Sequence, residues 1–193
     1  AQYLLSTQQP DFFSVYLKGC DSMSHQYLKY YFWDQHPDKL IPENLELYRD
    51  LINNYYIYLD KVIGELVEAA DDSSIFIIVS DHGFDEVMLP TGHYNHISTT
   101  PPGVILCAGS GIKQNYQLEN AHVYDIAPTI LYMFGLPTAE DFDGKVLTDV
   151  FTTPAAVRTI PTYDTGERAS RQVIESDVDA AVKDKLRALG YTQ

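Results

Sequence analysis

Two stretches of the chain are apolar at nearly every position. Residues 74–80 read SIFIIVS and residues 103–109 read GVILCAG, without the alternation of polar and apolar side chains that marks a half-buried strand. Continuous apolar strands are typical of a parallel sheet that is buried on both faces. Residues 12–19, FFSVYLKG, are rich in aromatic and β-branched residues and are also predicted to form a strand, which ends at Gly19-Cys20-Asp21.

The segments between these strands have apolar residues at helical spacing. Residues 42–70 are predicted to form one long amphipathic helix, with Pro42 in its first turn. Its apolar stripe, at steps of three and four, comprises Tyr48, Ile52, Tyr55, Leu59, Val62, Leu66 and Ala70. Further helices are predicted from about Ser22, over residues 123–135, and from about Asp177.

The order of these elements predicts an α/β fold. Strand, helix, strand, strand and helix, with continuously apolar strands, indicate an α/β sandwich around a mostly parallel sheet. Residues 152–170 are polar, contain proline and are predicted to be an extended surface segment. In sheets of this kind, binding sites lie beyond the carboxyl ends of the strands.

Acidic and imidazole side chains follow two of the predicted strands. Asp21 and His25 lie four residues apart, so they point the same way if the turn after the first strand is helical. Asp81 and His82 follow the second strand, where Gly83 lets the backbone turn so that both converge. Carboxylate and imidazole ligands suit zinc, with manganese or iron as alternatives. We therefore expect a metal site at this edge of the sheet.

The loop after the second strand adds His93 and His96 within TGHYNH. Asp-x-x-x-His alone is weak evidence for a metal site, because polar residues one helical turn apart are common. Asp-His-Gly after a buried strand is stronger evidence, because an ordinary strand end does not need two charged groups in a crowded crevice. The prediction depends on their combination. His36 and His122 lie in polar segments and are interpreted as surface histidines. The tyrosines of the long helix are interpreted as core and surface residues, not as a platform for stacking bases.

Charge and composition narrow the range of partners. The 13 Lys and Arg residues stand against 27 Asp and Glu residues, giving a formal net charge of −14, which repels nucleic acid and anionic membranes. A phosphorylated substrate would need bound cations to offset this field. No apolar run approaches the roughly 18 residues of a membrane helix. Cys20 and Cys107 are expected to be buried free thiols.

Several segments together resemble the type I phosphodiesterase and nucleotide pyrophosphatase family of the alkaline phosphatase superfamily. In chain order they are GCDSMSH, VSDHGF, TGHYNH, PPGVILCAGSGI, VYDIAPTILYMFGLPTAEDFDGKVL and the ending LRALGY. The resemblance implies a three-layer, alkaline phosphatase-like sandwich. Residues 1–151 would be the metal-binding, carboxyl-terminal part of its catalytic domain, and residues 152–193 an extended segment and a helix packed on the same domain.

The resemblance also implies two divalent metal ions close together, zinc in preference to manganese. His93 is favoured over His96 as a ligand because it directly follows Gly92, although His96 stays an alternative. By resemblance, the first ion is held by Asp21, His25 and one of His93 and His96, and the second by Asp81 and His82.

One part of the family pattern is missing. Family members carry a further metal-binding Asp and a Thr or Ser nucleophile upstream, and nothing before Asp21 matches them. Ser14 lies in a predicted strand, Ser6 and Thr7 lie at the start, and Asp11 precedes the strand. We therefore expect the carboxyl-terminal portion of a longer enzyme, truncated at the N-terminus, with no catalytic residue assigned and no activity alone.

The function implied by the resemblance is metal-dependent hydrolysis of phosphate diesters or nucleotide pyrophosphates. The substrate would be a small phosphate ester or nucleotide, attacked by a metal-activated hydroxyl in the complete enzyme. The alternatives are a sulfatase or phosphomutase of the same superfamily, and a non-catalytic module that binds metal or a partner. A periplasmic or extracellular location is favoured for the full-length protein, although the chain does not separate it from a cytoplasmic one.

Overall fold

A computed structural model of the chain describes residues 1–35, 40–84 and 101–166. The predictions for His36, His93, His96 and the last helix lie outside these residues. The helices are α1 (Gln2–Gln8), α2 (Gly19–Tyr31), α3 (Pro42–Tyr48), α4 (Leu51–Ala69) and α5 (Ile126–Met133), with 3₁₀ turns η2 (Val123–Asp125) and η3 (Thr148–Val150). The strands are β1 (Ile75–Val79), β2 (Ile105–Gly109), β3 (Thr138–Ala139) and β4 (Thr159–Ile160).

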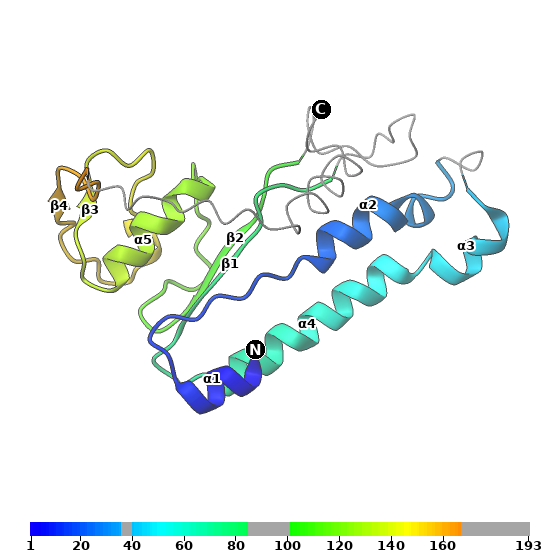
Figure 1. Cartoon of the computed structure of the whole chain (residues 1–193), viewed down its shortest axis with the longest axis horizontal. Helices are drawn as coiled ribbons and strands as arrows, with labels where there is room; N and C mark the ends of the chain where they lie inside the picture. Colours follow the sequence, from blue (N-terminus) through cyan, green and yellow to red (C-terminus); the bar gives the residue numbers. More distant parts are fainter. Residues whose placement is uncertain (36–39, 85–100, 167–193) are drawn as a thin grey trace.

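The helical part of the molecule is built around α4. Helices α1, α2 and α3 all contact α4, and Figure 1 shows α1 at one end of it and α2 alongside. The predicted long helix is two helices, because Arg49 and Asp50 form a turn between α3 and α4. The predicted apolar stripe is nevertheless correct: Ile52 and Leu59 are buried, and its other members are partly buried. The periodicity of the sequence thus identified the buried face of these helices but not the turn that separates α3 from α4.

The two long apolar strands pair with each other, but in the opposite sense to the prediction. β1 and β2 are antiparallel, with Ile75 opposite Gly109 and Val79 opposite Ile105. A mostly parallel sheet was expected because continuous apolar strands favour burial on both faces. The expected burial is also wrong, because no residue of β1 or β2 is buried and Leu106 is 56% exposed. Strand direction depends on the connection between the strands, which composition does not report. The only parallel pair in the described ranges is the short β3–β4 pair.

The prediction of a strand over residues 12–19 is wrong. Residues 13–17 form neither helix nor strand, and Gly19 already belongs to α2. The segment runs as a coil from α1 to α2 (Figure 1). Phe12 and Tyr16 remain exposed. Strand propensity describes a side chain that fits a pleated surface, and here that surface is lacking.

Residues 112–166 form a separate cluster around α5. Residues Ile112, Leu147, Val150 and Phe151 make its buried core. The helix predicted over residues 123–135 is confirmed as η2 followed by α5, and Gly135 ends it with a φ of 65°. Figure 1 shows this cluster on the opposite side of the β1–β2 pair from α2 and α3.

The described residues therefore form a mixture of helices and two small two-stranded sheets, which agrees with an α/β fold in the broad sense. The three-layer sandwich stays a prediction. No helix in the described part of the chain is both long and apolar enough to span a membrane.

Candidate metal centre

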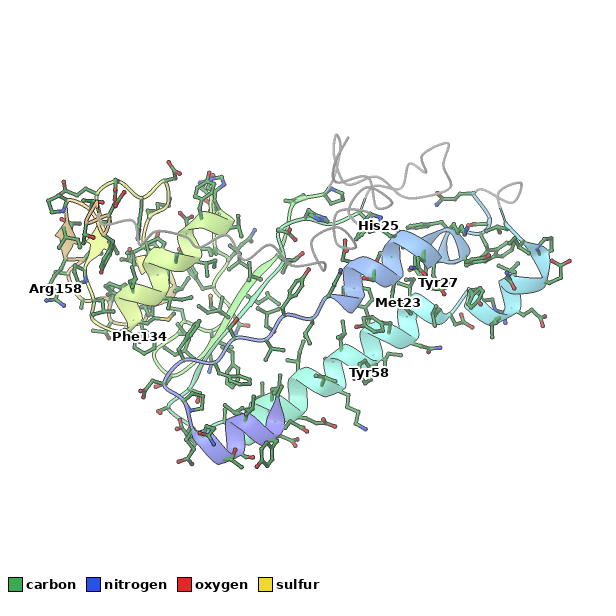
Figure 2. The ribbon with its side chains drawn as sticks, viewed as in Figure 1. Met23, His25, Tyr27, Tyr58, Phe134 and Arg158 are labelled. Atoms are coloured by element: carbon green, nitrogen blue, oxygen red, sulfur yellow. The ribbon has the colours of Figure 1, made fainter. Side chains whose placement is uncertain are left out.

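The first pair of predicted ligands lies in the first two turns of α2. His25 Nε2 is 3.3 Å from Asp21 Oδ1, so the predicted helical turn brings the two side chains together. Both atoms are shielded from solvent, and the His25 side chain is only 13% exposed. Asp21 occupies the first turn of the helix, where the helix dipole favours a carboxylate. Figure 2 shows His25 on the side of α2 that faces away from α4.

The second pair follows β1 directly. His82 Nε2 lies 3.8 Å from Asp81 Oδ2, and the Asp81 side chain is largely exposed. His82 Nδ1 lies 2.8 Å from the carbonyl oxygen of Gly83. A carbonyl only accepts, so this hydrogen bond places the proton on Nδ1 and leaves the lone pair of the neutral ring on Nε2. That tautomer is the one that binds a metal through Nε2.

Backbone contacts with the segment before β2 fix the Asp81–His82 turn. The Ser80 amide donates to the Val104 carbonyl at 2.8 Å, and the Gly83 amide donates to the Pro101 carbonyl at 2.9 Å. A side chain at Gly103 would overlap the Ser80 carbonyl, so the close approach of the two segments requires glycine there. These backbone contacts therefore hold the Asp81–His82 turn in position at the end of β1.

The ring of Phe84 joins the two pairs. Its centroid lies 5.0 Å from that of His25 and 5.8 Å from that of His82, and both contacts are edge-to-face. Two imidazoles from distant parts of the chain, each with a carboxylate of its own segment nearby, thus contact one phenyl ring. Sequence analysis did not single out Phe84; its position directly after Asp-His-Gly was the available signal.

The donor types fit a divalent cation such as zinc. The fit is incomplete within the described ranges, because these residues contain no group of three or more His, Cys, Asp or Glu side chains placed to hold an ion. Each pair needs further ligands, and His93 and His96 lie outside the described residues. The metal assignments of all six residues remain predictions.

The sequence analysis interpreted His122 as a surface histidine and the two cysteines as buried free thiols. His122 is exposed, as predicted, and stacks on Tyr124 with ring centroids 5.0 Å apart. Cys20 and Cys107 are free and partly buried. Burial raises the pKa of both thiols, with a hydrogen bond to Tyr56 partly opposing this for Cys20. Protonated thiols are poor nucleophiles and poor metal ligands.

Comparison with known proteins identifies the family to which the chain belongs. The sequence profile of the type I phosphodiesterase / nucleotide pyrophosphatase family matches residues 1–186. The chain belongs to this family, a member of the alkaline phosphatase superfamily, as its segments indicated.

Several curated relatives are phosphoglycerate mutases. The 2,3-bisphosphoglycerate-independent phosphoglycerate mutase 2 of Methanosarcina barkeri is 35% identical over 92 residues, which are 46% of this chain and 17% of the mutase. A mutase of the same description from Cereibacter sphaeroides is 32% identical over 93 residues, 46% of this chain and 18% of the mutase. The chain thus covers less than a fifth of these relatives. No solved structure matches it significantly.

Proposed function

We propose that this chain is a metal-binding part of a hydrolase of phosphate diesters or nucleotide pyrophosphates. The observation that supports this most is the approach of the Asp21–His25 and Asp81–His82 pairs to one ring, Phe84, in a chain that matches the family over residues 1–186. Two segments remote in sequence each bring an imidazole with a neighbouring carboxylate to this ring, which is the arrangement that the proposed centre requires.

In this proposal each pair takes part in holding one ion. Asp21 and His25 hold the first, with His93 or His96 as a third ligand, and Asp81 and His82 hold the second. Bound divalent ions supply Lewis acidity and offset the charge of a phosphate ester, which a chain of net charge −14 otherwise repels. The residues of this chain position those charges: Gly83 sets the tautomer of His82, and α2 aligns Asp21 with His25.

We assign no nucleophile to this chain. The proposed hydrolysis requires a hydroxyl from elsewhere in a longer protein, so the chain alone binds metal without turnover.

Metal binding by the purified chain tests the proposal. Titration with zinc chloride and elemental analysis after dialysis should give about two ions per chain, with manganese as the second metal to try. Replacing His25 or Asp81 by Ala should weaken zinc affinity more than about tenfold, as loss of a ligand exceeds loss of its hydrogen-bonding partners. His122→Ala is the matched control, since His122 is exposed and stacks on Tyr124. Equal binding by all variants would contradict the proposed centre.

A phosphomutase is the second candidate, and the similarity to phosphoglycerate mutases favours it. The longer protein that contains this chain decides between the two. Release of nitrophenol from a phosphodiester, lost in His25→Ala, supports the hydrolase. Interconversion of phosphoglycerate isomers without such release supports the mutase, and metal binding without either activity supports a non-catalytic module.

A further inference from the structure

We propose that Phe84 is a positioning residue that aligns the imidazoles of His25 and His82 for metal binding. The inference rests on the proposed metal centre, and it assigns a role to a side chain that is not itself a ligand.

The geometry of the ring contacts carries the proposal. The Phe84 ring meets His25 at an interplanar angle of 82° and His82 at 67°. Edge-to-face contacts of this kind are favourable and depend on orientation. Each imidazole is therefore restricted in rotation by the same phenyl ring, which fixes the directions of both rings relative to one another.

Phe84 is itself anchored from two sides. Its side chain packs against the cluster formed by Leu28 of α2 and Ile52 of α4. The hydrogen bond from the Gly83 amide to the Pro101 carbonyl fixes the backbone just before it. The Phe84 ring therefore connects the apolar cluster between α2 and α4 to the turn that follows β1.

The two imidazoles differ in what else orients them. His82 has the hydrogen bond from Nδ1 to the Gly83 carbonyl, which also limits ring rotation. His25 has its contact with Asp21 on its own helix. Both rings contact Phe84, so its removal should loosen the relation between the two pairs.

Zinc titration of Phe84 variants measures the effect. Phe84→Leu keeps an apolar side chain but removes the ring, and it should weaken zinc affinity about three- to tenfold, corresponding to one or two aromatic contacts. Phe84→Tyr keeps the ring and should restore affinity to within about twofold of the native value. Ile52→Val is the control, because it trims the same apolar cluster without changing an aromatic ring.

Histidine ring signals in the metal-free chain give a second readout. In NMR spectra, Phe84→Leu should shift the ring proton signals of both His25 and His82, whereas Ile52→Val should shift neither by a comparable amount. Unchanged ring signals and zinc affinity in Phe84→Leu would overturn the inference, as would equal losses in Ile52→Val. If the native chain binds no zinc, the proposed function fails, while the metal-free spectra still decide whether Phe84 orients the rings.

Discussion

At the scale of single residues, the most deeply buried carboxylate among the described residues is Asp125, which is 1% exposed. Its Oδ1 accepts from the Lys145 amide and its Oδ2 from the His122 amide, both at 2.8 Å. Thr129 continues the arrangement by donating to the Asp125 carbonyl and accepting from the Leu147 amide. These bonds tie the start of α5 to the segment before η3, so Asp125 has a structural role.

Asp125→Asn should destabilise this part of the molecule. An amide offers one acceptor atom where the carboxylate offers two, so one buried N–H group loses its partner at a cost of about 1–3 kcal/mol. Urea unfolding followed by circular dichroism measures the loss. Asp143→Asn is the control, because Asp143 is exposed and close in the chain. Equal stability of both variants would show that the two amide bonds contribute little.

Residue-scale chemistry was only partly predictable from the sequence. The spacing of Asp21 and His25 predicted their contact, because a helical turn fixes the separation of such residues. The tautomer of His82 and the double contact of Phe84 were not predictable. Both depend on where the Gly83 carbonyl and the α2 helix lie in space, which no local pattern specifies.

At the scale of elements, the backbone that follows β1 and the backbone that precedes β2 approach closely at Ser80 and Gly103. Gly103→Ala places a Cβ against the Ser80 carbonyl and should cost about 1–3 kcal/mol, because a backbone atom cannot move aside as a side chain does. It should also weaken zinc binding by displacing the Asp81–His82 turn. Gly64→Ala is the opposite case: Gly64 lies within α4 with open space around it, so alanine should stabilise by about 0.5–1 kcal/mol. Thermal unfolding of both variants checks the two signs.

The turn between α4 and β1 should make stability depend on pH. Asp71 accepts hydrogen bonds from the Ser73 amide, the Ser73 hydroxyl and the Ser74 hydroxyl. The bonds to Ser73 lead the effects that lower the pKa of Asp71 in the folded chain. A lowered folded pKa means that the stabilisation is complete above the ordinary Asp pKa and is lost as pH falls through the lowered value.

Asp71→Asn resembles the protonated carboxyl group and tests this dependence. The native chain should be more stable than the variant near neutral pH, and the difference should vanish in acid below the lowered pKa of Asp71. Asp72→Asn should show no such convergence, because the hydrogen bonds of this turn go to Asp71. Urea denaturation across a pH series measures the difference, and a constant gap would contradict the assignment.

The elements themselves were predicted better than their pairing. Helical periodicity gave α4 and α5 because a single element determines which of its faces is buried. The direction of β2 relative to β1, and the absence of a strand over residues 12–19, depend on partners elsewhere in the chain. Local composition contains no information on those partners.

At the scale of the whole molecule, the candidate centre lies where the helical part meets the end of the β1–β2 pair. α2 contributes one pair of donors and the turn after β1 contributes the other. The cluster around α5 has its own core of Ile112, Leu147, Val150 and Phe151 and lies on the other side of the strands from α2 (Figure 1). A ligand at the centre should therefore couple two elements and leave the third region unchanged.

Hydrogen exchange with and without zinc tests this coupling. Zinc at about 100 times its dissociation constant should stabilise the bound state by about 2.7 kcal/mol, because the ions bind the folded chain selectively. Protection should rise together in residues 19–31 of α2 and residues 75–84, and excess EDTA should reverse it. Amides of α5 should change little, since that helix packs on a different core. Protection confined to one of the two donor segments would mean that the pairs do not form a common centre, whereas a uniform rise would indicate a general effect of zinc on the chain.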